Sequence, residues 1–113
     1  MNTTWQPITE PDLHTLLQSA EQAMSGDITL FWHQIRLPQP ELWQQHPWAD
    51  EICGFWVVAV MGKNCLYFND RTQGFSFGSF SKWGRIDDYL PSKLPLCDQL
   101  RTLLSPAALI AEA

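Results

Sequence analysis

The segment from Ile52 to Met61 most constrains how this chain can fold, because a strand over it is apolar on both faces. Alternate residues of a strand point to opposite faces. One face would carry Ile52, Trp56, Val58 and Val60, and the other Cys53, Phe55, Val57, Ala59 and Met61. A strand apolar on both sides must be covered on both sides. We therefore expect it inside the sheet, with chain or partner protein packed against each face.

Two shorter apolar segments follow this strand and predict that it continues as a meander. Gly62 to Asn64 predict a turn, Cys65 to Asn69 a returning strand, and Phe75 to Phe80 a third strand after a second turn. Phe80 departs from the alternation of Phe75 and Phe77, which predicts a β-bulge at Gly78-Ser79. Short connections of this kind join antiparallel strands.

Helices are predicted near both ends of the chain. Thr9 suits an N-cap, Pro11 falls in the first turn, and leucines and alanines then recur at spacings of three and four up to Gly26. A second helix is predicted from Leu96 to Leu104, before Pro106. Residues 107–113 are expected either to extend as a short helix or to form a frayed tail.

The segment between the first helix and the apolar strand is predicted to be a strand and then a long loop. Asp27 to Leu37 are interpreted as a strand, and the prolines at 38, 40 and 47 indicate a loop from Pro38 to Trp48. The element order predicts one α+β domain over residues 1–113. Its mainly four-stranded antiparallel sheet (strand, long loop, three-strand meander) would carry the N- and C-terminal helices on one face.

Composition excludes several classes of protein. The 113 residues are 45% hydrophobic, which argues against disorder, and the net charge of −5 argues against a cationic nucleic-acid binder. No signal sequence or membrane-spanning segment is evident, so a cytoplasmic location is expected. The three cysteines have no metal-ligand spacing, and neither a metal nor another cofactor is predicted.

One motif could indicate catalysis. Residues 74–78 match the G-x-S-x-G nucleophile elbow, in which a sharp strand-to-helix turn exposes the serine, here Ser76. No helical pattern follows Gly78, and all three histidines precede the serine, whereas in hydrolases of that fold the histidine follows it. We expect a non-enzymatic protein, with a serine hydrolase acting through Ser76 as the least favoured alternative.

The proline-rich loop is the predicted partner-binding site. Long loops without secondary structure are uncommon in compact domains and tend to be functional, and tryptophan is enriched at binding hot spots. The candidate residues are Leu42, Trp43, His46, Trp48, Asp50 and Glu51. Two interpretations stay open for the tryptophans. They either fold inward as a plug over the sheet or face outward as a binding surface.

Residues of the meander resemble a family of small, functionally uncharacterised bacterial α+β proteins. The resemblance covers about a third of the chain. Its residues are the run from Gly54 to Val60, Tyr67-Phe68-Asn69-Asp70, Gly74-Phe75, Phe80, and Gly84-Arg85-Ile86 through Tyr89. Such proteins have a hairpin ending in an aromatic-Asn-Asp turn, a Gly-Phe strand and a short closing helix. The resemblance implies an α+β fold in the bacterial cytosol, and it implies no catalytic residue.

These observations favour a non-enzymatic interaction module. Residues 1–62 contain seven acidic residues and one basic residue, Arg36, so this half could steer a basic partner. We expect a regulatory adaptor or a toxin-immunity-like protein that acts by surface occlusion, with a protein partner or self-association and without nucleic acid or membrane. The alternative is a small-molecule binding domain with an aromatic pocket between sheet and loop.

Overall fold

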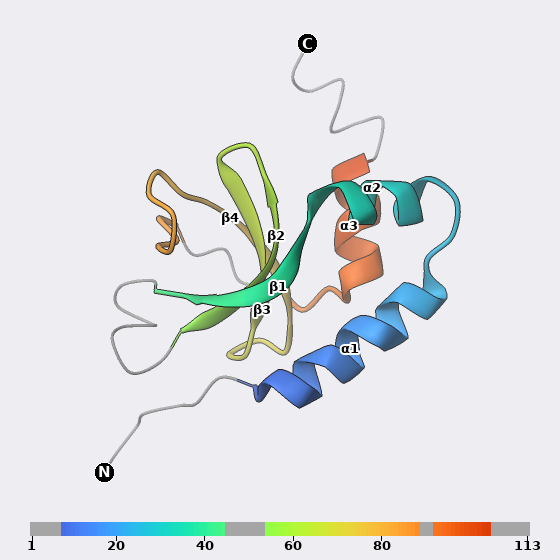
Figure 1. The fold of residues 1–113 in the computed structure, drawn as a ribbon, viewed down its shortest axis with the longest axis horizontal. Helices are drawn as coiled ribbons and strands as arrows, with labels where there is room; N and C mark the ends of the chain where they lie inside the picture. The colour runs from blue at the N-terminus through green and yellow to red at the C-terminus, as the bar shows by residue number, and fades with distance from the viewer. Residues whose placement is uncertain (1–7, 45–53, 89–91, 105–113) are drawn as a thin grey trace.

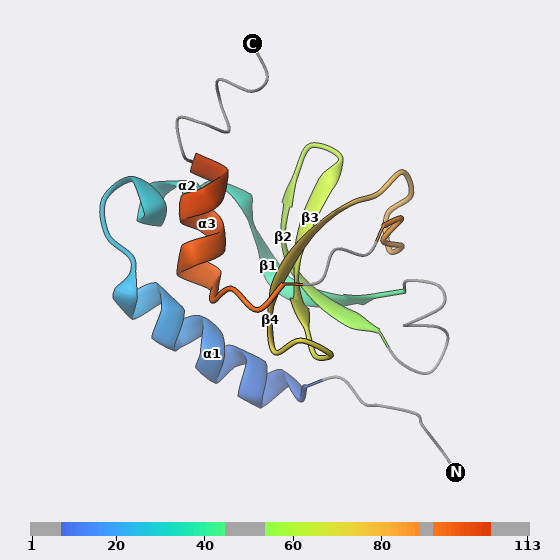
Figure 2. The ribbon, with the colours of Figure 1, turned by 180° about the vertical axis from the view of Figure 1, so that it is seen from behind.

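The computed structural model describes residues 8–44, 54–88 and 92–104. They form three helices and a four-stranded antiparallel sheet, in the order α1 (Glu10–Ala23), α2 (Asp27–Ile35), β1 (Arg36–Trp43), β2 (Phe55–Met61), β3 (Asn64–Asn69), β4 (Gly74–Ser79) and α3 (Leu96–Leu104). The helices lie on one side of the sheet (Figures 1 and 2). The predicted α+β fold is confirmed. No helix within these ranges is long and apolar enough to cross a membrane.

The two terminal helices form where their sequence signals place them. Thr9 caps α1, its Oγ1 accepting a hydrogen bond from the Asp12 N–H over 3.3 Å, and the helix buries Leu13 and Leu17. α3 has the predicted bounds and buries Leu96, Gln99 and Leu100. In both helices the apolar stripe, repeated every three to four residues, decides which side meets the sheet.

The strand predicted over Asp27–Leu37 is wrong for most of its length, because residues 27–35 form α2. Its apolar residues Ile28, Phe31, Trp32 and Ile35 recur at helical spacing, and all four pack against the core. Leu30, which a strand would have placed beside Ile28, is instead 64% exposed. Gly26, at a φ of +57°, lets the chain leave α1 and enter this second helix directly.

The loop predicted from Pro38 is also wrong for its first residues, because β1 runs from Arg36 to Trp43. β1 is an edge strand paired only with β2. Its register shifts between Arg36 and Glu41, where Pro38 and Pro40 lie. Proline is tolerated here because an edge strand has one unpaired side. The argument that this segment is no central strand therefore holds, although it is a strand.

The three-strand meander is confirmed, but the predicted bulge at Gly78-Ser79 is wrong. β3 and β4 pair without interruption from Asn64↔Ser79 to Asn69↔Gly74. A register shift occurs in β2 instead, between Val57 and Ala59. Phe80 continues the alternation of Ser76 and Gly78 and so belongs to the opposite face of the sheet from Phe75 and Phe77.

Each face of the sheet carries its own core. The helix-side core contains Leu13, Leu17, Trp32, Val58, Ala59, Leu66, Phe68, Phe75, Leu96 and Leu100. The far-side core contains Trp43, Phe55, Val57, Cys65, Tyr67, Phe80 and Ile86. β2 thus has apolar contacts on both sides, as its sequence requires. The far side is covered by the segment that follows β4, through Phe80 and Ile86.

That covering segment is fastened to both edges of the sheet. At β1, the Gln44 N–H donates to Gly84 O over 3.0 Å and the Ile86 N–H donates to Gln44 O over 2.8 Å. At β4, the Asp87 N–H donates to Ser79 O, and the Ser79 N–H donates to Asp88 Oδ1. The segment is therefore part of the fold, held by backbone hydrogen bonds at each end.

Candidate binding cleft

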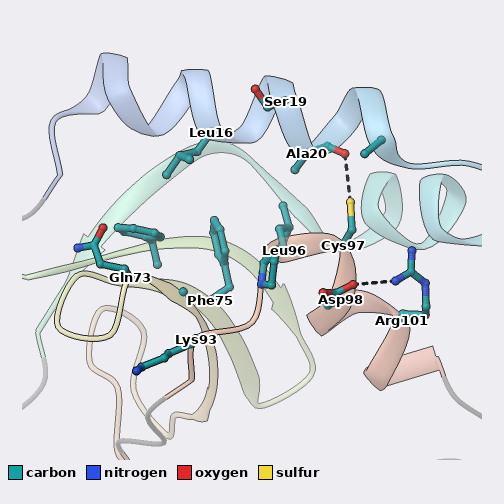
Figure 3. A pocket seen from close by; sticks show the side chains of 14 residues that line it. Leu16, Ser19, Ala20, Gln73, Phe75, Lys93, Leu96, Cys97, Asp98 and Arg101 are labelled. Atoms are coloured by element: carbon teal, nitrogen blue, oxygen red, sulfur yellow. Dashed lines mark hydrogen bonds and ion pairs between the residues drawn. The ribbon is translucent and has the colours of Figure 1, made fainter.

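A cleft of about 530 Å³ lies between α1, α3 and the β3–β4 turn (Figure 3). This volume falls in the range of small-molecule sites. Its apolar lining comes from α1, the sheet and α3 through Leu16, Ala20, Ala23, Phe68, Phe75 and Leu96. The helices meet the sheet here without filling the space between them.

The cleft is open because small side chains face it where larger ones would close it. Ser19, Ala20 and Ala23 present little volume from α1, whereas the rings of Phe68 and Phe75 meet edge to face at 5.3 Å. Leu16 points toward the sheet and is still 38% exposed. An apolar side chain that faces the core but keeps this exposure borders a space that another molecule can enter.

One end of the cleft is rigid, because the segment before α3 is bonded to β4 and to its preceding turn. The Phe75 N–H donates to Leu94 O over 2.8 Å, and Gln99 Nε2 donates to Phe75 O over 2.8 Å. Thr72 Oγ1 donates to Ser92 O. Breaking such a bond would leave a buried polar group without a partner, which is destabilising because the group has also lost its hydration. The backbone of residues 92–94 is therefore fixed at this end.

The charged residues around the cleft differ at its two ends. Arg101 lies 2.7 Å from Asp98 Oδ1, one turn away on α3, so this pair is locally neutral. Lys93 lies at the opposite end with Gln73 (Figure 3) and is exposed. Among the described residues, Lys93 has no ion-pair partner. In the described lining of the cleft, the one charge without an ion pair is thus the positive charge of Lys93.

The cysteines of the described ranges are not activated. Cys97 borders the cleft, its Sγ donating to Ala20 O over 3.2 Å, and burial raises the pKa of its thiol. Burial in the far-side core, with a smaller contribution from Asp88, raises the pKa of Cys65 to about 12. A thiol needs a lowered pKa to act as a nucleophile. Both side chains act as packing groups.

Metal binding finds no support in residues 8–44, 54–88 and 92–104, where no three of the His, Cys, Asp and Glu side chains cluster to hold an ion. Ser76 is fully buried in the middle of β4, and its Oγ accepts a hydrogen bond from Asn69 Nδ2 over 3.1 Å. β4 continues to Ser79, so the sharp turn of a nucleophile elbow does not occur at this serine.

Asp70 is the one carboxyl group with a strongly shifted pKa in the described part of the chain. Burial raises its pKa to about 6, against a smaller opposing effect of the Ile8 N–H, which donates to Oδ1 over 2.9 Å. Its Oδ2 is buried without a hydrogen-bond partner. The Ile8 carbonyl also accepts the Trp56 indole N–H over 2.7 Å. Asp70 therefore helps to anchor the chain that leads into α1, at the cost of a buried negative charge.

The predicted partner-binding residues are separated by the structure. Trp43 is 1% exposed and packs in the far-side core, whereas Leu42, which points to the other face of β1, is 48% exposed. His46, Trp48, Asp50 and Glu51 lie outside the described residues. Of the two interpretations left open, Trp43 follows the inward one.

Among the residues that the structure describes, the exposed tryptophan is Trp83, to which the sequence assigns no role. Its ring is 55% exposed and lies 5.0 Å from the ring of Trp43, measured between centroids. Glu41 Oε1 accepts both indole N–H groups, from Trp43 over 3.0 Å and from Trp83 over 2.9 Å. One carboxylate thus fixes a buried and an exposed tryptophan together. Lys82 and Arg85, both exposed, flank Trp83 in the chain.

Comparisons with protein families, with curated proteins and with solved structures found no match to this chain. The resemblance to small bacterial proteins accordingly stays a prediction. Interpretation of the cleft rests on its geometry. The sequence signal that could have located it is the small side chains of α1 at positions 19, 20 and 23, which interrupt a stripe of leucines.

Proposed function

We propose that this protein is a non-enzymatic binding domain that holds a small apolar molecule in the cleft between α1 and α3. The observation that carries the proposal is an apolar space of about 530 Å³ that includes the exposed Leu16 and the rings of Phe68 and Phe75. Apolar pockets with a few polar groups at their rim are the usual form of small-molecule sites. This favours the alternative function predicted from the sequence, with the pocket on the helix side of the sheet.

Binding without catalysis is favoured by the groups around the cleft. Burial raises the pKa of the Cys97 thiol, so this side chain is not an activated nucleophile. Arg101 is paired with Asp98. Ser76 is buried in β4. The groups that the cleft offers to a ligand are apolar side chains and one cationic side chain, Lys93.

The proposal is tested with the neutral fluorescent probe N-phenyl-1-naphthylamine, whose emission rises in apolar surroundings. We expect saturable binding to the native protein and a higher melting temperature, because a ligand of the native state stabilises it. Leu16→Trp would fill the cleft and abolish binding. Gln22→Trp, at an exposed position of α1 outside the cleft, is the matched control and should bind normally. Equal binding by both variants would reject the cleft as the site.

A second candidate function is the interaction module first expected from the sequence, and the position of Trp83 favours it. Tryptophan and arginine are enriched among residues that dominate binding energy at protein interfaces. An exposed tryptophan held by Glu41 loses little conformational entropy on binding a partner. We propose that a regulatory adaptor or immunity-like protein would use Trp83, flanked by Lys82 and Arg85, as its anchor.

This second function is tested by affinity purification from the native host, with the partner identified by mass spectrometry and then purified. We expect Trp83→Ala to weaken the purified complex at least ten-fold, a usual loss at an interface hot spot. Leu30→Ala, at a 64% exposed position on α2, should leave affinity unchanged. A partner that binds both variants equally would contradict the role of Trp83.

The location proposed for the protein is the bacterial cytoplasm. Cys65 and Cys97 are free cysteines, which supports a reducing compartment.

A further inference from the structure

We infer that the ligand of the cleft is a carboxylic acid with an apolar body, whose carboxylate is bound by Lys93. This inference rests on the proposed function, because it assumes that the cleft is a binding site, and it adds the chemical class and the orientation of the ligand. The apolar body would lie against Phe68, Phe75 and Leu16, and the acid group would lie at the β3–β4 end.

The first support is the fixed position of the Lys93 backbone. Its neighbours Ser92 and Leu94 are both bonded, Ser92 O to Thr72 Oγ1 and Leu94 O to the Phe75 N–H. Gly74 packs so closely here that a Cβ on it would stand 2.6 Å from Ser92 O. Residue 93 therefore cannot move away from the mouth of the cleft. The Lys93 side chain is flexible, but the backbone that carries it is fixed.

The second support is the balance of charge around the cleft. At the α3 end, Asp98 and Arg101 neutralise each other over 2.7 Å. At the other end, the Gln73 carboxamide already donates to Asp70 O over 2.8 Å. Lys93 is the one charged group of the described lining without an ion pair. A ligand with one negative charge would complete this pattern, whereas a cation would meet repulsion.

The third support is the arrangement of apolar and charged groups along the cleft. Small and apolar residues of α1 and the sheet form one continuous wall, and Lys93 borders the cleft at the end where Gln73 lies, with its flexible side chain directed outward (Figure 3). A molecule that is apolar along its length and acidic at one terminus matches both features at once. A charge-assisted hydrogen bond is about twice as strong as a neutral one, so the acid group would add affinity and set the direction of binding.

The inference is tested with three probes of equal chain length: decanoate, 1-decanol and decyltrimethylammonium. Each is titrated below its micelle concentration into the full chain, and binding is followed by calorimetry. We expect decanoate to bind about five-fold tighter than 1-decanol, in line with a partly exposed ion pair, and the cation to bind weakest. Lys93→Met should remove the preference for decanoate, and Lys93→Arg should keep it.

Controls separate this inference from the proposed function. Lys63→Met, at an exposed turn remote from the cleft lining, should preserve the preference for decanoate. Equal affinities for decanoate and 1-decanol, or a preference that survives Lys93→Met and is lost in Arg101→Met, would overturn the role of Lys93 and leave the cleft as an apolar site. If none of the three probes binds, the proposed function fails as well. Unchanged melting temperatures show that the variants fold.

Discussion

Trp83 and Glu41 lie 42 residues apart in the chain, yet the indole N–H of Trp83 donates to Glu41 Oε1 over 2.9 Å. The same oxygen accepts the indole N–H of Trp43 over 3.0 Å. Edge strand β1 is thereby joined to the segment that covers the far side of the sheet. Because a single acceptor serves both rings, its removal should affect the two tryptophans together.

Glu41→Ala should lower the free energy of unfolding by about 2 kcal/mol, since the partly buried Trp43 N–H loses a charged acceptor. Two indole N–H resonances should shift in the ¹H–¹⁵N spectrum, and Trp43→Phe and Trp83→Phe would assign them. Glu41→Gln retains an acceptor oxygen and should cost less. A shift of one indole resonance alone would contradict the shared contact.

Adjacent residues of β1 should respond very differently to truncation. Trp43→Ala removes a side chain that is 1% exposed in the far-side core, and we expect a loss of about 4 kcal/mol. Leu42→Ala removes a side chain that is 48% exposed, and we expect about 1 kcal/mol or less. Urea denaturation measures both. Similar losses of stability in the two variants would contradict an inward-facing Trp43 and an outward-facing Leu42.

Asp70 should make stability fall as pH rises from about 4 to 6. Its pKa is raised from 3.8 to about 6 in the folded chain, so the folded state binds more protons than the unfolded state across this window. The contribution of Asp70 is fully present below pH 3.8 and is lost once the folded group ionises near pH 6. Urea denaturation at intervals across the window measures the slope.

Asp70→Asn should remove this contribution to the slope, because the amide does not ionise, and it keeps an oxygen to accept the Ile8 N–H. Asp87→Asn removes one negative charge at an exposed position and is the matched control. A difference between wild type and Asp70→Asn that stays constant from pH 4 to 7 would contradict the buried carboxylate.

Replacement by alanine should lower stability more at Gly74 than at Gly62. Gly74 has no space for a Cβ, whereas Gly62 has space but a backbone conformation that alanine disfavours. Gly74→Ala would press a Cβ into the backbone of Ser92 and Lys93, and we expect a loss of about 3 kcal/mol together with weaker probe binding in the cleft. Gly62→Ala has open space around it but a φ of +63°, and we expect about 1 kcal/mol. Gly62→Ala should leave probe binding unchanged. An equal loss of binding in both variants would contradict the role of Gly74 packing in shaping the cleft.

The parts of the fold that could be predicted are those with local signals. Thr9, Pro11 and the leucine spacing define α1 within its own sequence, and the turn residues after Met61 and Asn69 define the meander. α2 was missed because Asp27 to Ile35 contains aromatic and β-branched residues that also suit a strand. The spacing of Ile28, Phe31, Trp32 and Ile35 is helical, and it is the signal that distinguishes a helix from a strand here.

The candidate site was harder to predict, because the cleft is made by residues distant in sequence. Leu16 on α1 and Leu96 on α3 border it only after both helices pack on the sheet. The sequence alone gives Trp83 no role, because its partner Glu41 lies 42 residues away in the chain. The sequence marks the tryptophans of the proline-rich segment as candidates, but only tertiary packing decides that Trp43 is buried and Trp83 exposed.

The two edges of the sheet have a consequence for how this chain meets other molecules. Pro38 and Pro40 deprive β1 of two backbone donors, and the outward N–H groups of Phe75 and Ser79 on β4 are already bonded to Leu94 and Asp88. A peptide that adds a strand at either edge of the sheet would therefore find few free backbone groups to bond. The same two edges oppose amyloid-like stacking of identical chains. Recognition by this protein falls to its side chains.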